Sequence, residues 1–180
     1  MIIIRSGKFK NKKLQTPDAD VRPTSDKIRQ AIFNILRSRA LPDLQNAWVL
    51  DAFAGTGALG LEALSQGAAQ AWFMENNPAV RKILEENLKC AGAQAMLLAV
   101  DACIPPRASH AMHIIFLDPP YGKNLLASAI TSLHQNSWID ADTLLVIESD
   151  ADEELILPSD FKIIDERKYG RTKIIFAILT

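Results

Sequence analysis

The segment that most constrains this fold is VLDAFAGTGALGLEA, residues 49–63, in which an apolar run leads into three glycines. Gly55, Gly57 and Gly60 match the spacing G-x-G-x-x-G and open a stretch with helical character. Glycines at these positions allow a tight turn and let a ligand approach the backbone at the start of a helix. The segment therefore predicts a strand, a ligand-binding turn and a helix in succession. A glycine-rich turn without a ligand is the alternative.

The rest of the chain alternates between short apolar runs and amphipathic stretches. The runs predict strands at 47–53, 69–75, 95–102, 112–120 and 143–149. The stretches predict helices at 57–67, 77–92 and 125–137. Residues 161–179 predict a final hairpin that turns at Tyr169-Gly170. Strands that alternate with helices of this length indicate an α/β fold with a parallel, three-layer sheet.

A basic segment precedes this core. Residues 2–17 predict a short hairpin, and Thr24 or Ser25 is expected to cap the helix that follows. We expect one domain, in which residues 1–40 are appended to a core formed by residues 41–180.

Charge is divided unevenly along the chain, although the net charge is only −1. Residues 1–39 contain ten Lys or Arg and three Asp, whereas residues 40–180 contain ten basic and eighteen acidic residues. A basic end on an otherwise acidic chain indicates a polyanionic partner. The alternative is a solvated basic face that binds nothing.

Other features argue against membrane and metal functions. No apolar run approaches the roughly 20 residues of a membrane helix. The N-terminal order of apolar and then basic residues is not that of a signal peptide, so we expect a cytoplasmic protein. Cys90 and Cys103 are expected to be reduced, packed thiols, and no spacing of Cys, His or Asp predicts a metal site.

Carboxylates near the ends of three successive predicted strands indicate which ligand the glycine turn holds. Glu75 lies twenty residues after Gly55, where a carboxylate can hold the two hydroxyls of a ribose. Asp51 and Phe53 complete the pattern D-x-F-x-G-x-G, which is typical of proteins that bind S-adenosylmethionine. Asp51 would meet the ammonium group of that ligand, whereas it would repel the pyrophosphate of a dinucleotide. Asp101 would accept a hydrogen bond from the adenine amino group.

The second motif is LDPPYG, residues 117–122, at the end of the fourth predicted strand of this core. The exocyclic amine of a base is a poor nucleophile because its lone pair is delocalised into the ring. Asp118 and the carbonyl of Pro119 would accept its two N–H bonds and turn the lone pair toward a methyl donor, and Tyr121 would stack on the base. Positioning and charge stabilisation would then carry the catalysis. The alternative is a strand that simply ends in a turn.

A family resemblance rests on segments that span nearly the whole chain: IIIRSGKFKNKKL, RPTSDKIRQAIFNIL, LDAFAGTGALGLEALSQGA, ENN, LDPPYG and ERKYGRTKIIF. In these the chain resembles the RsmD-type 16S ribosomal RNA guanine-N2 methyltransferases, of the class I S-adenosylmethionine-dependent group. The motif DPPY is shared with DNA adenine methyltransferases, whereas RPT-x-D-x-x-R, FN-x-L and the glycine turn in succession are more specific. Gln30 departs from the family pattern, which usually has Glu there.

The resemblance implies a Rossmann-like fold whose seven-stranded, mostly parallel sheet has an antiparallel C-terminal strand. It implies S-adenosylmethionine as cofactor, and 16S ribosomal RNA or the assembled small subunit as the partner of a monomer. The cofactor residues would be Asp51, Phe53, Gly55, Gly57, Glu75, Asp101 and Thr24, although Thr24 is also a candidate cap. The target-base residues would be Asp118, Pro119 and Tyr121. The residues facing RNA would be Arg5, Lys8, Lys10, Lys12, Lys13, Arg22, Lys27 and Arg29.

Three other functions are consistent with parts of this pattern. An adenine-N6 methyltransferase acting on DNA or RNA would use the same DPPY motif, although the chain is short for a separate DNA-recognition domain. A non-catalytic RNA-binding protein on the same fold would have no need of Asp118, Pro119 and Tyr121. A nicotinamide oxidoreductase fits the glycine spacing alone.

Overall fold

The structure is a computed structural model that describes residues 2–17, 25–38, 43–120, 125–153 and 155–180. Its main sheet contains β3 (Trp48–Asp51), β4 (Gln70–Met74), β5 (Met96–Leu98), β6 (Ile114–Leu117), β7 (Leu144–Asp150), β8 (Phe161–Tyr169) and β9 (Thr172–Leu179). These seven strands lie in the order β5-β4-β3-β6-β7-β9-β8. Neighbours from β5 to β7 pair in parallel, and β9 runs antiparallel between β7 and β8. The mostly parallel sheet with an antiparallel C-terminal strand is therefore confirmed.

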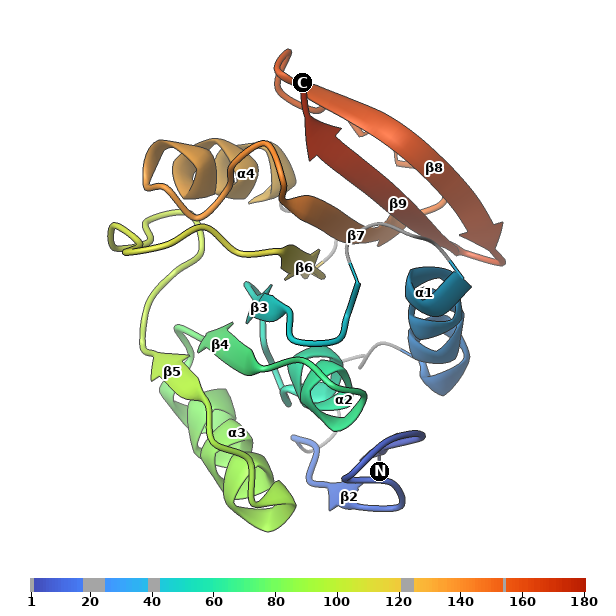
Figure 1. Ribbon diagram of the computed structural model, residues 1–180, viewed down its shortest axis with the longest axis vertical. Coiled ribbons are helices and arrows are strands. Elements are labelled where there is room, and N and C mark those ends of the chain that lie inside the picture. The colour runs from blue at the N-terminus through green and yellow to red at the C-terminus, as the bar shows by residue number, and fades with distance from the viewer. Residues whose placement is uncertain (1, 18–24, 39–42, 121–124, 154) are drawn as a thin grey trace.

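Helices cover both faces of the sheet and make the three predicted layers (Figure 1). α1 (Asp26–Ser38), α2 (Ala58–Ser65) and α3 (Pro78–Ala91) pack on one face, and α4 (Leu125–Gln135) packs on the other. Successive strand residues point to opposite faces, so that Val49 joins the core under the first three helices and Leu50 joins the core under α4. Both faces of the central strands are buried, which explains their nearly continuous apolar sequences.

Local sequence signals fix the ends of the helices. The side chain of Asn77 accepts hydrogen bonds from the first N–H groups of α3, with Pro78 as the first helical residue, and Gly92 ends that helix in the left-handed region at φ 67°. The hydroxyl of Ser25 accepts from the N–H of Ile28 at 3.2 Å, so Ser25 caps α1.

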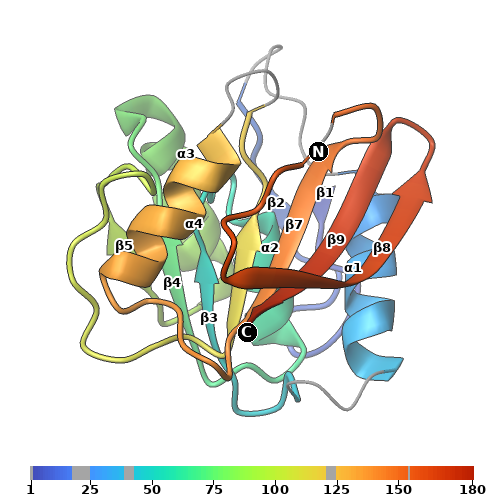
Figure 2. The ribbon, with the colours of Figure 1, turned by 90° about the horizontal axis from the view of Figure 1, so that it is seen from above.

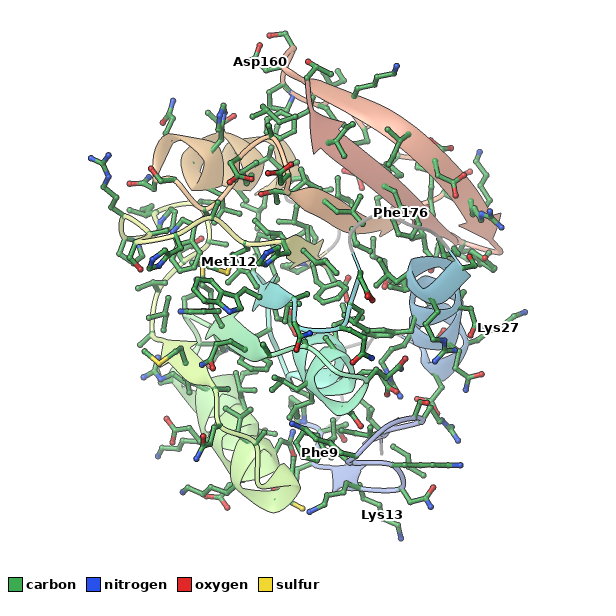
Figure 3. The ribbon with its side chains drawn as sticks, viewed as in Figure 1. Phe9, Lys13, Lys27, Met112, Asp160 and Phe176 are labelled. Carbon is green, nitrogen blue, oxygen red and sulfur yellow. The ribbon has the colours of Figure 1, made fainter. Side chains whose placement is uncertain are left out.

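The N-terminal segment forms the predicted hairpin, in which β1 (Ile2–Ile3) pairs antiparallel with β2 (Lys13–Leu14). Its apolar side chains, Ile2, Ile4, Phe9 and Leu14, are buried in the same core as α1, α2 and α3. Figure 3 shows Phe9 where the hairpin meets α2, and its N–H donates to the hydroxyl of Ser65 at 2.8 Å. The hairpin therefore packs against the outer side of the helical layer.

Two expectations need correction. The strand predicted at 95–102 is shorter in the structure, where β5 spans only Met96–Leu98. Cys90 and Cys103 are both free, as predicted, but Cys90 is exposed on α3 and is not packed. In the part of the chain that the structure describes, no helix has the length and apolar character needed to cross a membrane.

Candidate active site

The order of the strands reverses at β3, which has β4 on one side and β6 on the other (Figure 2). From β3 the chain builds outward through β4 to β5, and then crosses back to β6 and β7. Ligands of such sheets bind beyond the carboxyl ends of the strands at this reversal. Asp51, Glu75 and Asp118 stand at or directly after the ends of β3, β4 and β6. We call this region the carboxyl edge.

Asp51 is the last residue of β3 and is only 2% exposed. Its Oδ2 accepts a hydrogen bond from the N–H of Gly60 at 3.0 Å, which ties the strand to the first turn of α2. Burial raises the pKa of Asp51 to about 8; the Gly60 N–H opposes this rise, and the charges of Asp118 and Glu75 add to it. A cation bound beside Asp51 would stabilise its charged form.

The turn between β3 and α2 requires glycine for close packing. Gly57 has φ 79°, and a Cβ there would lie 2.4 Å from Cδ1 of Leu84 in α3. A Cβ at Gly60 would lie 2.4 Å from the ring of Phe73 in β4. At Gly55, by contrast, a Cβ would meet a single atom within 4 Å, at 3.9 Å. The second and third glycines thus bring the helix close to the sheet, and the first leaves open space at the carboxyl edge.

Glu75 connects the glycine turn to the start of α3. Its Oε2 accepts from the N–H of Gly55 at 3.0 Å, and its Oε1 accepts from the N–H of Asn77 at 2.8 Å. Each oxygen of a carboxylate has two acceptor sites, so both can accept a further hydrogen bond from a ligand hydroxyl. The carboxylate is thus held beside the glycine turn, and its contact with a ribose stays a prediction.

Asp101 lies beyond the end of β5, and two hydrogen bonds fix its side chain. Oδ2 accepts from Nδ2 of Asn76 at 3.1 Å, and Oδ1 accepts from the N–H of Cys103 at 2.8 Å. The contact with Asn76 joins Asp101 to the segment that carries Glu75. Asn76 was missed by sequence reasoning, although its place directly after a strand-end carboxylate is a usable signal.

Asp118 and Pro119 follow β6 at the same edge. The parallel register places Asp51 beside Phe116, so that Asp118 stands two residues beyond that pair. Asp118 is half-buried and Pro119 is buried. The charge of Asp118 also raises the pKa of Asp51, as expected for two carboxylates on neighbouring strand ends. Tyr121 lies outside the described residues, and half-buried Phe53 packs toward the core under α4.

Comparison with known proteins places the chain in a family. A family model described as "Conserved hypothetical protein 95" matches residues 2–178. The chain belongs to this family. It is the RsmD family that the sequence motifs indicate, and its relatives carry the name Ribosomal RNA small subunit methyltransferase D.

Two of these RsmD relatives align over most of their length. The one from Haemophilus influenzae is 33% identical over 174 residues, 93% of this chain and 88% of the relative. The one from Escherichia coli is 34% identical over 174 residues, 94% of this chain and 86% of the relative. A solved structure titled "Putative methyltransferase yhhF from Escherichia coli" superposes with a TM-score of 0.86 at 33% identity, covering 99% of this chain and 97% of that one. The class I methyltransferase fold is thus confirmed.

The basic surface of this RsmD-family chain lies on the hairpin and α1. Five of the side chains predicted to face RNA are exposed: Arg5, Lys8, Lys10, Lys13 and Lys27. Figure 3 shows Lys13 and Lys27 on the outer side of these elements. Lys12 is half-buried and donates to the carbonyl of Cys90 at 2.7 Å. We refer to Lys8, Lys10 and Lys13 as the hairpin lysines; Arg22 and Thr24 lie outside the described residues.

The prediction that Arg29 faces RNA is wrong. Its side chain is 1% exposed, and Nη2 donates to the carbonyl of Ile3 at 2.6 Å and to Oδ1 of Asp26 at 2.7 Å. Its Nε lies 3.4 Å from Oε2 of Glu62, which is also buried. Asp26 pairs in addition with exposed Arg5. A guanidinium enclosed in this way has no surface to offer a phosphate.

Sequence reasoning also missed the acceptor that anchors the hairpin to α2. Glu62 accepts from the N–H of Arg5 through Oε2 and from the N–H of Ser6 through Oε1, both at 3.0 Å. A lone acidic residue within an apolar helix was the available signal, because a buried charge requires a partner. Within the described ranges, no group of three His, Cys, Asp or Glu side chains is arranged to hold a metal ion.

Proposed function

We propose that this chain transfers a methyl group from S-adenosylmethionine to the exocyclic N2 amine of a guanine in small-subunit ribosomal RNA. The observation that carries this proposal is the meeting of two motifs on neighbouring strands, the glycine turn after β3 and Asp118-Pro119 after β6. The names of the two aligned relatives support ribosomal RNA as the substrate. Guanine N2 as the acceptor follows from the family resemblance.

The side chains of the carboxyl edge fit this cofactor. When bound, S-adenosylmethionine supplies a methyl group on a positively charged sulfur. Buried Asp51 would gain a cation that stabilises its carboxylate, which burial otherwise disfavours. Glu75 would accept hydrogen bonds from the ribose hydroxyls beside Gly55. Asp101 is held by the side chain of Asn76, the residue after Glu75, and would accept a hydrogen bond from the adenine amino group.

Asp118 and Pro119 would prepare the amine for attack. Each would accept one N–H of the amine, which draws these bonds out of the plane of the base and leaves the lone pair on nitrogen facing the methyl donor. The nitrogen would take the methyl group as the carbon–sulfur bond breaks, with the electron pair of that bond left on sulfur. The carboxylate of Asp118 would stabilise the positive charge that develops on nitrogen, and Asp118 or water would take the proton that it loses. Tyr121, by its place in the motif, would stack on the base.

The basic surface would supply affinity for the RNA backbone. The hairpin lysines, Arg5 and Lys27 are exposed on elements that pack against the helical layer. Cationic side chains neutralise phosphates without reading the sequence, so specificity would come from the carboxyl edge. In this proposal residues 1–40 form the RNA-binding part and residues 41–180 the catalytic core.

The test is to offer labelled S-adenosylmethionine with naked small-subunit RNA, assembled small subunits and duplex DNA, and to identify the methylated nucleoside. N2-methylguanosine in one of the RNA substrates is expected. N6-methyladenosine would establish the adenine alternative. Binding of RNA without any methyl transfer would indicate a non-catalytic protein.

A further inference from the structure

Glu148 is a buried carboxylate two residues before the carboxyl end of β7, and the proposed reaction gives it no role. It is 6% exposed. β6 and β7 pair in parallel, with Leu117 beside Ile147. The residue after each member of this pair is acidic: Asp118 directly follows β6, and Glu148 is the next residue of β7. The two are therefore neighbours at the carboxyl edge. Glu148 is therefore the buried carboxylate next to the half-buried Asp118.

The two side chains also share a face of the sheet. Phe116 and Val146 belong to the core under α1, α2 and α3, whereas Leu117 and Ile147 belong to the core under α4. Because side chains alternate along a strand, Asp118 and Glu148 both return to the first face.

Asp51 lies on this face too, since it accepts a hydrogen bond from α2. Three neighbouring strands, β3, β6 and β7, thus carry one carboxylate each to the same side of the carboxyl edge.

This arrangement matches the donor pattern of one base. The edge of guanine offers N1–H and two N2–H bonds, which are adjacent donors. Asp118 and the carbonyl of Pro119 account for the two N2–H bonds in the proposed reaction, and N1–H is left without an acceptor. In adenine the ring nitrogen next to the exocyclic amine is itself an acceptor, and a carboxylate facing it would be repelled.

We infer that Glu148 accepts the N1–H of the target guanine and thereby selects guanine over adenine. This inference rests on the proposed function, and it adds the residue that determines which amine is methylated. Glu148 takes part in contacts within the protein as well. A carboxylate has about four acceptor sites, so it can accept from N1–H alongside other donors.

The experiment compares guanine with 2-aminopurine at the target position of the RNA. The analogue keeps the exocyclic 2-amine but has an unprotonated N1 and lacks the 6-oxygen. The wild-type protein should prefer guanine by about 10²-fold or more in kcat/KM, because a site built for a donor strongly rejects an analogue without it. In Glu148→Gln that preference should fall to within about tenfold, while S-adenosylmethionine affinity and the melting temperature stay near wild type. Loss of the 6-oxygen affects both proteins equally, so the change in preference isolates N1–H.

Two further variants complete the design. Glu166→Gln makes the same chemical change at an exposed position on β8 and should keep the full preference. Glu148→Asp keeps the charge, but its shorter side chain moves the carboxylate away from N1–H. It should lower the rate on guanine more than the rate on 2-aminopurine. If Glu148→Gln does not fold, the preference for guanine over 2-aminopurine is measured with Glu148→Asp instead.

Equal losses on both substrates in the Glu148 variants would show a structural role and overturn the inference. Wild-type methylation of guanine together with an unchanged preference in Glu148→Gln would overturn it while the proposed function stands. Absence of N2-methylguanosine with the wild-type protein would refute both.

Discussion

Asp51 should couple cofactor affinity to pH. Burial raises its pKa to about 8, so in the free protein Asp51 holds a proton through most of the neutral range. A bound cation favours the carboxylate, and binding must then release that proton. The proton competes with the cofactor below pH 8, which means that affinity should rise with pH.

The size of the effect follows from linkage. If the bound state has a pKa below about 5, affinity should increase roughly 25-fold between pH 6 and pH 7.5. The comparison stops there because the α-amino group of the cofactor itself titrates near pH 8. In Asp51→Asn the position carries no proton to release, so this dependence should disappear.

Isothermal titration calorimetry at several pH values measures the dependence, and repetition in buffers of different ionisation enthalpy counts the released proton. 5′-Methylthioadenosine, which has neither the ammonium nor the sulfonium charge, is the matched control ligand and should bind with little pH dependence. An affinity that is flat from pH 6 to pH 7.5 in the wild-type protein, or one equally steep in Asp51→Asn, would refute the reasoning.

Four other changes test the carboxyl edge and the basic surface. Glu75→Gln should weaken cofactor binding by about 1–3 kcal/mol in calorimetry, the range for a lost charge-assisted hydrogen bond; unchanged affinity would remove Glu75 from the site. Asp118→Ala should keep the cofactor affinity and lose at least about 10²-fold in kcat, the usual scale for one electrostatic group, and near-normal turnover would contradict its role. Gly60→Ala should lower the melting temperature, at a cost of about 1–3 kcal/mol, since its Cβ would meet the ring of Phe73 at 2.4 Å; an unchanged melting curve would show that the ring yields freely. Changing the hairpin lysines to Ala should flatten the dependence of RNA affinity on salt and leave cofactor binding alone, whereas an unaltered slope would make them solvated surface.

The central fold was predictable because the sequence signals for strands, turns and helix ends all indicated the same alternation of strands and helices. The glycine turn after an apolar run, the proline and asparagine that begin α3, and Gly92 that ends it all use chemistry that acts within a few residues. Strand ends could be matched to one another without knowledge of the packing, since parallel strands bring their carboxyl ends to one edge. Asp51, Glu75 and Asp118 were therefore found from sequence alone as residues of that edge.

The errors arose where long-range packing decides the outcome. Asp101 was placed at a strand end, but β5 stops at Leu98, because the extent of an edge strand depends on its single neighbour β4. The family resemblance placed Arg29 on the RNA-facing surface, and nothing near it in sequence indicated that this arginine would be buried. Besides Asp26 in the same helix, its partners are Glu62 in α2 and the carbonyl of Ile3, both distant in sequence.

The burial of Arg29 bears on how the basic surface would act. Its ion pair with Glu62 lies at the junction of α1 and α2, and the same carboxylate accepts two backbone N–H groups of the hairpin. Removing one partner of this buried ion pair would leave an uncompensated charge, at a cost of about 3–5 kcal/mol. The hairpin lysines are consequently carried by a support fixed to α2, whose first turn is fixed in turn to Asp51 at the carboxyl edge. Phosphate contacts on the hairpin would then set where the RNA lies relative to Asp118, although they read no base themselves.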